Sequence, residues 1–116
     1  MLQRKGIATN LISCVKEFRV ESNCTSEHFE EHVDAIADAL FGLEQTWPKL
    51  LDSSVGADLE NKILEITVTV EHAGITEGQA FATAMIRKAI KECGGHFGDD
   101  AESVVETKSN AELVAA

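Results

Sequence analysis

Apolar and polar residues alternate almost without interruption from Ile63 to Glu71. Successive side chains of an extended chain point to opposite faces of a sheet, so a period of two predicts a strand with one buried face and one polar face. The buried face of this strand is expected to hold Leu64, Ile66, Val68 and Val70, and the polar face Glu65, Thr67, Thr69 and Glu71.

Three other segments have weaker strand patterns. From Ile12 to Glu21, Ile12, Cys14, Phe18 and Val20 fall on one parity. Lys16 is the exception on that parity, which predicts a bulge or an edge position near it. Residues 51–59 predict a second strand with Leu51 on its apolar parity, joined to the strong strand by a short hairpin in which Asn61 takes a positive φ. Residues 103–107 predict a short last strand.

Two segments have helical periodicity. Apolar residues recur at steps of three and four between Ser26 and Glu44, and Trp47-Pro48 ends this helix because proline cannot continue it. The second helix is expected to begin near Thr76, which forms a capping box with Gln79, and to end before residues 94–95, a pair of glycines.

The order strand, helix, strand, strand, helix, strand is the split βαβ pattern, and it resembles the ferredoxin-like superfold. This resemblance implies an α+β sandwich in which two helices cover one face of an antiparallel sheet. We expect an N-terminal arm over residues 1–11, a single domain over 12–107 and a tail over 108–116. Because the superfold serves many unrelated functions, it does not predict one here.

Composition narrows the class of function. The chain has 116 residues, 44% of them hydrophobic, and a net charge of -10, which repels phosphate backbones. The polar strand face also offers carboxylates in place of the aromatic rings on which RNA bases stack, so we expect no direct nucleic-acid binding. No apolar run is long enough to span a membrane. Three widely spaced cysteines predict neither a disulfide framework nor a zinc site, and they favour the cytoplasm.

Candidate chemistry is sparse. His28 and His32 are four residues apart on a predicted helix, beside Glu31, but no third metal ligand is placed with them. Cys24 precedes a helix, where a thiolate is stabilised, yet no basic residue is paired with it. The acidic loop lacks the ligand spacing of a calcium site and is interpreted as a solvated turn; its residues are His96, Asp99, Asp100 and Glu102. We therefore predict no metal, no cofactor and no catalytic set.

The first functional hypothesis is a non-enzymatic protein-association module, either a homo-oligomer or a subunit of a larger assembly. Its expected contact residues are Glu65, Thr67, Thr69 and Glu71. The alternative is an inhibitor that mimics nucleic acid and binds a basic enzyme through an acidic ridge on the first helix, formed by Glu27, Glu30, Glu31, Asp34 and Asp38. A third hypothesis is a ligand-binding domain or enzyme with a pocket between the sheet and the helices.

Overall fold

The structure is a computed structural model that describes residues 9–21, 25–93 and 103–115. Four strands and two helices alternate in the order expected from the sequence. Their bounds are β1 Asn10–Glu21, α1 Ser26–Thr46, β2 Leu50–Asp58, β3 Ile63–His72, α2 Ile75–Glu92 and β4 Ser103–Ala115.

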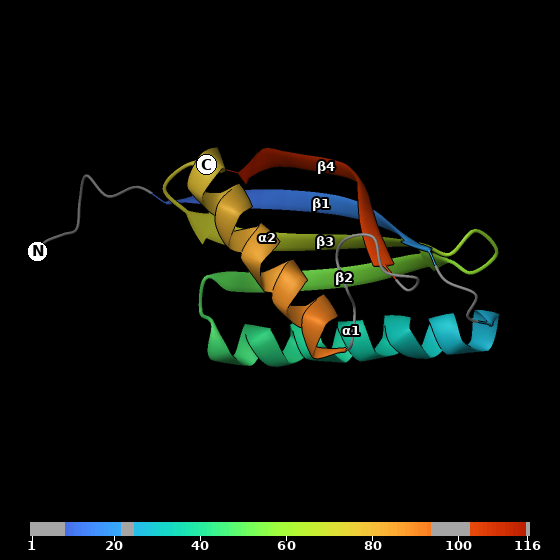
Figure 1. The fold of residues 1–116 in the computed structure, drawn as a ribbon. Coiled ribbons are helices and arrows are strands. Elements are labelled where there is room, and N and C mark those ends of the chain that lie inside the picture. Colours follow the sequence, from blue (N-terminus) through green and yellow to red (C-terminus); the bar gives the residue numbers. More distant parts are fainter. Residues whose placement is uncertain (1–8, 22–24, 94–102, 116) are drawn as a thin grey trace, which may run out of the picture.

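The strands form one antiparallel sheet in the order β2-β3-β1-β4, and two helices complete an α+β fold of the ferredoxin-like type (Figure 1). The last strand expected over residues 103–107 is present and extends to residue 115, so residues 108–115 belong to β4 and do not form a tail. The first and last strands of the chain therefore lie side by side.

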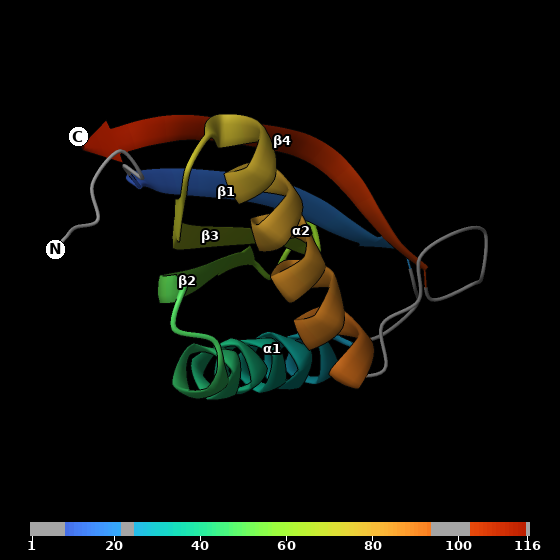
Figure 2. The same cartoon turned by 90° about the vertical axis from the view of Figure 1, so that its left-hand side faces the viewer.

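Both helices cover the same face of the sheet, and the core lies between them and the sheet (Figure 2). The strong strand β3 has the predicted inward parity, because Leu64, Ile66, Val68 and Val70 are each at most 1% exposed. On the helices, the expected apolar stripes face these strands; their fully or nearly buried members include Phe29, Ile36, Leu40, Leu43, Ala82, Met85, Ile86, Ala89 and Ile90.

Helix α1 begins and ends as its sequence predicts. The Thr25 hydroxyl accepts a hydrogen bond from the His28 amide at the N-terminus, and Trp47 is the C-terminal cap just before Pro48. The capping box predicted for α2 is wrong. That helix begins one residue before Thr76, at Ile75, with Gly74 as a cap that offers no side chain. Gln79 does not reach back to the cap, because its amide donates to Ser109 of β4.

Helix α2 packs closely on the central strand β1. Gly78 is buried, and a methyl group at its α-carbon would overlap the end of the Ile12 side chain. A glycine in the first turn therefore lets the helix approach the sheet at this point.

Two predictions about the strands are wrong. The edge position expected near Lys16 is wrong, since β1 is a central strand; the β1–β4 register does shift close by, between Glu17 and Phe18, with the extra residue in β4. The Lys16 side chain points into the core and the residue is 4% exposed. Leu51 is 44% exposed because a register shift between Leu50 and Asp52 turns it away from the core, and Leu50 is buried in its place.

The turn between β2 and β3 uses a different residue than the sequence suggested. The positive φ, 56°, belongs to Lys62 and not to Asn61. Asp58 organises this turn, because its carboxylate accepts hydrogen bonds from the amides of Glu60 and Asn61 and from the Asn61 side chain. Neither of the helices in the described part of the chain is long and apolar enough to cross a membrane.

Candidate functional site

The sheet has one face that neither α1 nor α2 covers, and we call it the open face. The four predicted contact residues lie on it, with Glu65 exposed and Thr67, Thr69 and Glu71 half-buried. Register places Thr67 between Ser54 of β2 and Val15 of β1. The same face carries Asp52 and Ser54 of β2, Ser13, Val15 and Glu17 of β1, and Lys108, Asn110 and Glu112 of β4.

Short side chains occupy the middle of the open face, and carboxylates surround them. Thr69 has Asp52 on one side and Ser13 on the other, while Glu65 stands beside Glu17. The Glu17 carboxylate accepts a hydrogen bond of 2.8 Å from the Thr107 hydroxyl. A shallow depression crosses this face from β3 to β4, lined by Val15, Glu17, Glu65, Lys108, Ser109 and Asn110. The surface is thus polar, acidic and nearly flat.

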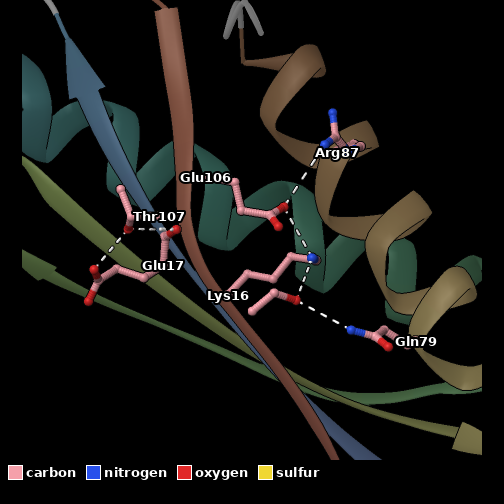
Figure 3. A network of polar contacts seen from close by, with 7 residues as sticks. Lys16, Glu17, Gln79, Arg87, Glu106 and Thr107 are labelled. Carbon is pink, nitrogen blue, oxygen red and sulfur yellow. Dashed lines mark hydrogen bonds and ion pairs between the residues drawn. The ribbon is translucent and has the colours of Figure 1, made fainter. Parts of the chain in front are cut away.

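A second polar group lies on the helix-covered face, and Figure 3 shows it between β1, β4 and α2. We call it the Lys16 cluster. The Lys16 ammonium donates to the Glu106 carboxylate at 3.1 Å and to the Ser109 hydroxyl at 2.8 Å. From α2, Arg87 approaches the same Glu106 oxygen at 3.9 Å and the Gln79 amide donates to Ser109 at 3.4 Å.

The Lys16 cluster links three elements through polar contacts. The Lys16 side chain donates to both Glu106 and Ser109, and Arg87 and Gln79 reach the same two residues from α2. The cluster joins β4 to β1 and α2, which makes it a clasp for the last strand.

Sequence reasoning missed this clasp because its members are about ninety positions apart in the chain. A signal was present in the apolar parity of the first strand, where Lys16 is the exception. Glu106 and Ser109 are the matching polar residues on the inward side of β4, opposite Phe18 and Lys16.

The acidic ridge follows the outer side of α1. Its five carboxylate residues are all exposed in the structure: Glu27, Glu30, Glu31, Asp34 and Asp38. Nearby, the Nε2 atoms of His28 and His32 are 3.2 Å apart, a distance at which one ring donates to the other. Within residues 9–21, 25–93 and 103–115, no three potential metal ligands come together, so the pair has no third ligand there.

The cysteines described by the structure are poor nucleophiles. Burial raises the pKa of Cys14, although the nearby Lys16 charge opposes this, and burial also raises the pKa of Cys93, with smaller contributions from the carboxylates of Glu92 and Asp38. Both thiols stay protonated at neutral pH. Cys24 and the loop residues His96, Asp99, Asp100 and Glu102 lie outside the described residues.

Phe81 of α2, His72 at the end of β3 and Trp47 form an aromatic cluster that the sequence did not suggest. The Phe81 ring lies 5.1 Å from His72 and 6.0 Å from Trp47 between ring centroids. The His72 Nε2 atom is buried with no hydrogen-bond partner among the described groups. This cluster closes one end of the core, and Trp47 remains 42% exposed.

Comparison with known proteins adds little beyond these observations. No protein-family model matches the chain, and no curated protein matches it. Among solved structures, the chain is similar to one described as a conserved protein from Methanosarcina mazei Go1, with 16% sequence identity over 91% of this chain and 92% of that one and a TM-score of 0.47.

Proposed function

We propose that this protein is a non-enzymatic association module that binds another protein surface through its open face. The observation that carries the proposal is the contrast between the two faces of one sheet. Both helices and the whole core lie on one face, whereas the other presents Thr67 and Thr69 in a setting of short side chains with no helix over it.

The size and chemistry of the open face suit a protein partner. Four strands spaced by about 4.8 Å and about ten residues long span roughly 600 Å², which approaches the roughly 800 Å² that each partner contributes to a standard interface. The central Ser and Thr side chains lose little conformational entropy when covered, and their hydroxyls can both donate and accept hydrogen bonds.

The charge of the face limits the partner. Carboxylates of Asp52, Glu17, Glu65 and Glu71 surround the centre, so a partner surface with Lys and Arg side chains is favoured. Two copies that met face to face would bring many of these carboxylates together. A homo-oligomer would therefore need a different route of contact, whereas a larger assembly could use this face directly.

The test compares a changed open face with a matched change elsewhere. Thr67→Arg/Thr69→Arg places two large cations at the centre, and Thr76→Arg adds one at an exposed position of α2. We expect wild-type protein and Thr76→Arg to retain copurifying partner chains. The double variant should lose these contacts while keeping its circular dichroism spectrum.

Two results would contradict the proposal. One is a wild-type chain that stays monomeric and brings down no partner. The other is a set of bound chains that the Thr67→Arg/Thr69→Arg variant retains unchanged.

The exposed acidic ridge supports a second candidate function, inhibition of a basic nucleic-acid-binding enzyme. Its five carboxylates follow one side of α1, where they could replace phosphates in a basic groove. Reversing the charges of Glu27, Glu30, Asp34 and Asp38 should abolish binding to such an enzyme and leave contacts of the open face intact. Unchanged affinity would rule this function out.

A further inference from the structure

Strand β4 forms an edge of the sheet whose outer side has no partner among the described strands. Two bulges divide it, because Thr107 and Val114 are extra residues relative to β1. Between them, Lys108 to Leu113 pair with β1 without a register shift. The edge therefore presents a regular stretch of six residues.

The direction of the backbone groups on this stretch follows from one hydrogen bond. The Val20 amide of β1 donates to Lys62, which lies on the β3 side. Because amides alternate sides along a strand, β1 residues of the other parity, including Val15, direct their backbone groups toward β4. Val15 lies opposite Asn110, so the residues on either side of Asn110 direct their amides and carbonyls outward. These residues are Ser109 and Ala111.

We propose that two copies of this chain associate through their β4 edges, antiparallel and centred on Asn110, to form one continuous eight-stranded sheet. In this register the outward backbone groups of Ser109 face those of the partner's Ala111. Lys108 lies opposite the partner's Glu112, and the two-fold symmetry repeats this ion pair.

Charge complementarity selects this register from its neighbours. A centre on Ser109 would place Glu106 against the partner's Glu112, and a centre on Ala111 would place Glu112 against the partner's Asn110. A shift by a single residue would oppose outward groups to inward ones. The centre on Asn110 therefore satisfies both the backbone and the charges.

Leu113 and Val114, at the end of β4, are 53% and 55% exposed. The proposed pairing runs over Lys108 to Glu112 and does not depend on them. The two bulges restrict pairing to a short stretch, so we expect a weak dimer at the small end of the range of protein interfaces.

This inference rests on the proposed function and deepens it by naming a second copy as one partner. Edge pairing within one sheet keeps side chains on their own faces, so both open faces lie on the same side of the dimer. The dimer would then present two copies of the open face to a larger partner, which increases its binding through effective concentration.

Sedimentation equilibrium over a range of concentrations tests the proposal through charge. Lys108→Glu and Glu112→Lys each convert both ion pairs into repulsive pairs, so each variant alone should weaken the dimer at least tenfold. An equimolar mixture of the two should form a heterodimer in which both pairs are again opposite in charge. The Lys108→Glu/Glu112→Lys variant should also recover dimerisation, and Glu60→Lys, on the turn between β2 and β3, should have no effect.

A backbone variant separates edge pairing from contact through the open face. Ala111→Pro removes an amide that points away from β1, and edge strands tolerate proline at such positions. We expect this variant to keep the circular dichroism spectrum of the wild type and to be monomeric, while Thr67→Arg/Thr69→Arg remains dimeric.

Three results would overturn the inference: a monomer at all concentrations, a dimer insensitive to the charges at positions 108 and 112, or a folded Ala111→Pro variant that still dimerises. None of them contradicts the proposed function, because loss of a different partner from the Thr67→Arg/Thr69→Arg variant would still support contact through the open face.

Discussion

Two residues determine the turn between β2 and β3: Lys62, whose backbone is strained, and Asp58, whose carboxylate accepts hydrogen bonds from the turn. Lys62 has φ 56°, a left-handed conformation in which its β-carbon crowds the following carbonyl. Its carbonyl accepts from Val20, so the strained residue also links the hairpin to β1. The Asp58 carboxylate accepts hydrogen bonds from the Glu60 and Asn61 amides of the same turn.

Replacing Lys62 with glycine should stabilise the protein. Glycine adopts a positive φ without steric strain, and we expect the free energy of unfolding to rise by about 0.5–1 kcal/mol. Urea denaturation measures the change. Lys62→Ala removes the same charge and keeps the β-carbon, so an equal gain in that variant would contradict the role of strain.

Asp58 should give the hairpin a pH-dependent contribution to stability. Hydrogen bonds from the Asn61 side chain and from the amides of Asn61 and Glu60 lower the pKa of Asp58 below its ordinary value of 3.8. A carboxyl group whose pKa is lower in the folded state stabilises the fold above its unfolded pKa, and this stabilisation is lost as the pH falls through its folded pKa.

The measurement is the urea midpoint of wild type and Asp58→Ala from neutral pH to below pH 3.8. Wild type should be the more stable at neutral pH, and the difference should shrink as the pH falls through the acid range. Asn61→Ala removes the largest cause of the lowered pKa, so it should reduce this pH dependence. A difference between wild type and Asp58→Ala that stays constant with pH would exclude the proposed linkage.

At the scale of elements, the attachment of β4 to the sheet depends on the Lys16 cluster. Most inward positions of β1 and β3 are apolar, whereas β4 offers Glu106 and Ser109 to a buried lysine. The ammonium is almost completely enclosed, with a side chain 5% exposed, and its carboxylate partner is 29% exposed. If Glu106 is removed, the Lys16 ammonium that remains has almost no access to water. If Lys16 is removed, the Glu106 carboxylate that remains can be solvated.

Glu106→Gln should destabilise the protein more than Lys16→Met. The first change leaves a buried ammonium without its counterion, which costs about 2–4 kcal/mol. The second leaves a carboxylate that reaches water and has Arg87 nearby, so a loss of about 1 kcal/mol or less is expected. Urea denaturation measures both losses. In Glu106→Gln, the rate of amide hydrogen exchange should increase most in β4.

The double variant Lys16→Met/Glu106→Gln is the control for this pair. It should be about as stable as Lys16→Met alone, because the amide then faces no unpaired charge. Additive losses in the double variant, or equal losses in the two single variants, would contradict the clasp.

At the scale of the whole molecule, repulsion between like charges opposes the compact state. The chain has 20 acidic and 10 basic residues, a net charge of -10. Because salt screens exposed charges over about 10 Å at 0.1 M ionic strength, raising sodium chloride from low concentration should increase the unfolding temperature. The charge-reversed ridge variant is less negative, so its unfolding temperature should respond less; an equal response would contradict this explanation.

Predictions from the sequence were correct where burial alone determined the pattern of residues. They were wrong where the pattern depended on polar residues far away in the chain. The alternation of β3 and the stripe of α1 required only burial, and both were correct. The pattern of residues 108–115 predicts a tail because the inward side of β4 holds Ser109 and Ala111 and so lacks an apolar run. Its polar character is explained by Lys16 across the sheet. A distant polar contact also explains the wrong capping box, because the Gln79 amide donates to Ser109 of β4 instead of to the start of its own helix.

For the candidate site, parity alone identified which side of β3 would remain polar. It could not show that β4 would present a free edge, because the register that sets Lys108 and Glu112 against β1 depends on two bulges. The aromatic contact between Trp47 and Phe81 likewise joins residues on opposite sides of the β2–β3 hairpin, and no local pattern indicates it.

The pairing of the first strand with the last also has a consequence during synthesis. β1 leaves the ribosome before β4, so one side of β1 lacks its partner until β2, β3 and both helices have been made. Until then, Lys16 has no counterion from β4, and β1 is an edge strand of the sheet that β2, β3 and β1 can form. Contacts of such long sequence separation slow folding and expose a surface prone to aggregation. Nascent chains of this protein should therefore be most prone to aggregation before β4 has been made.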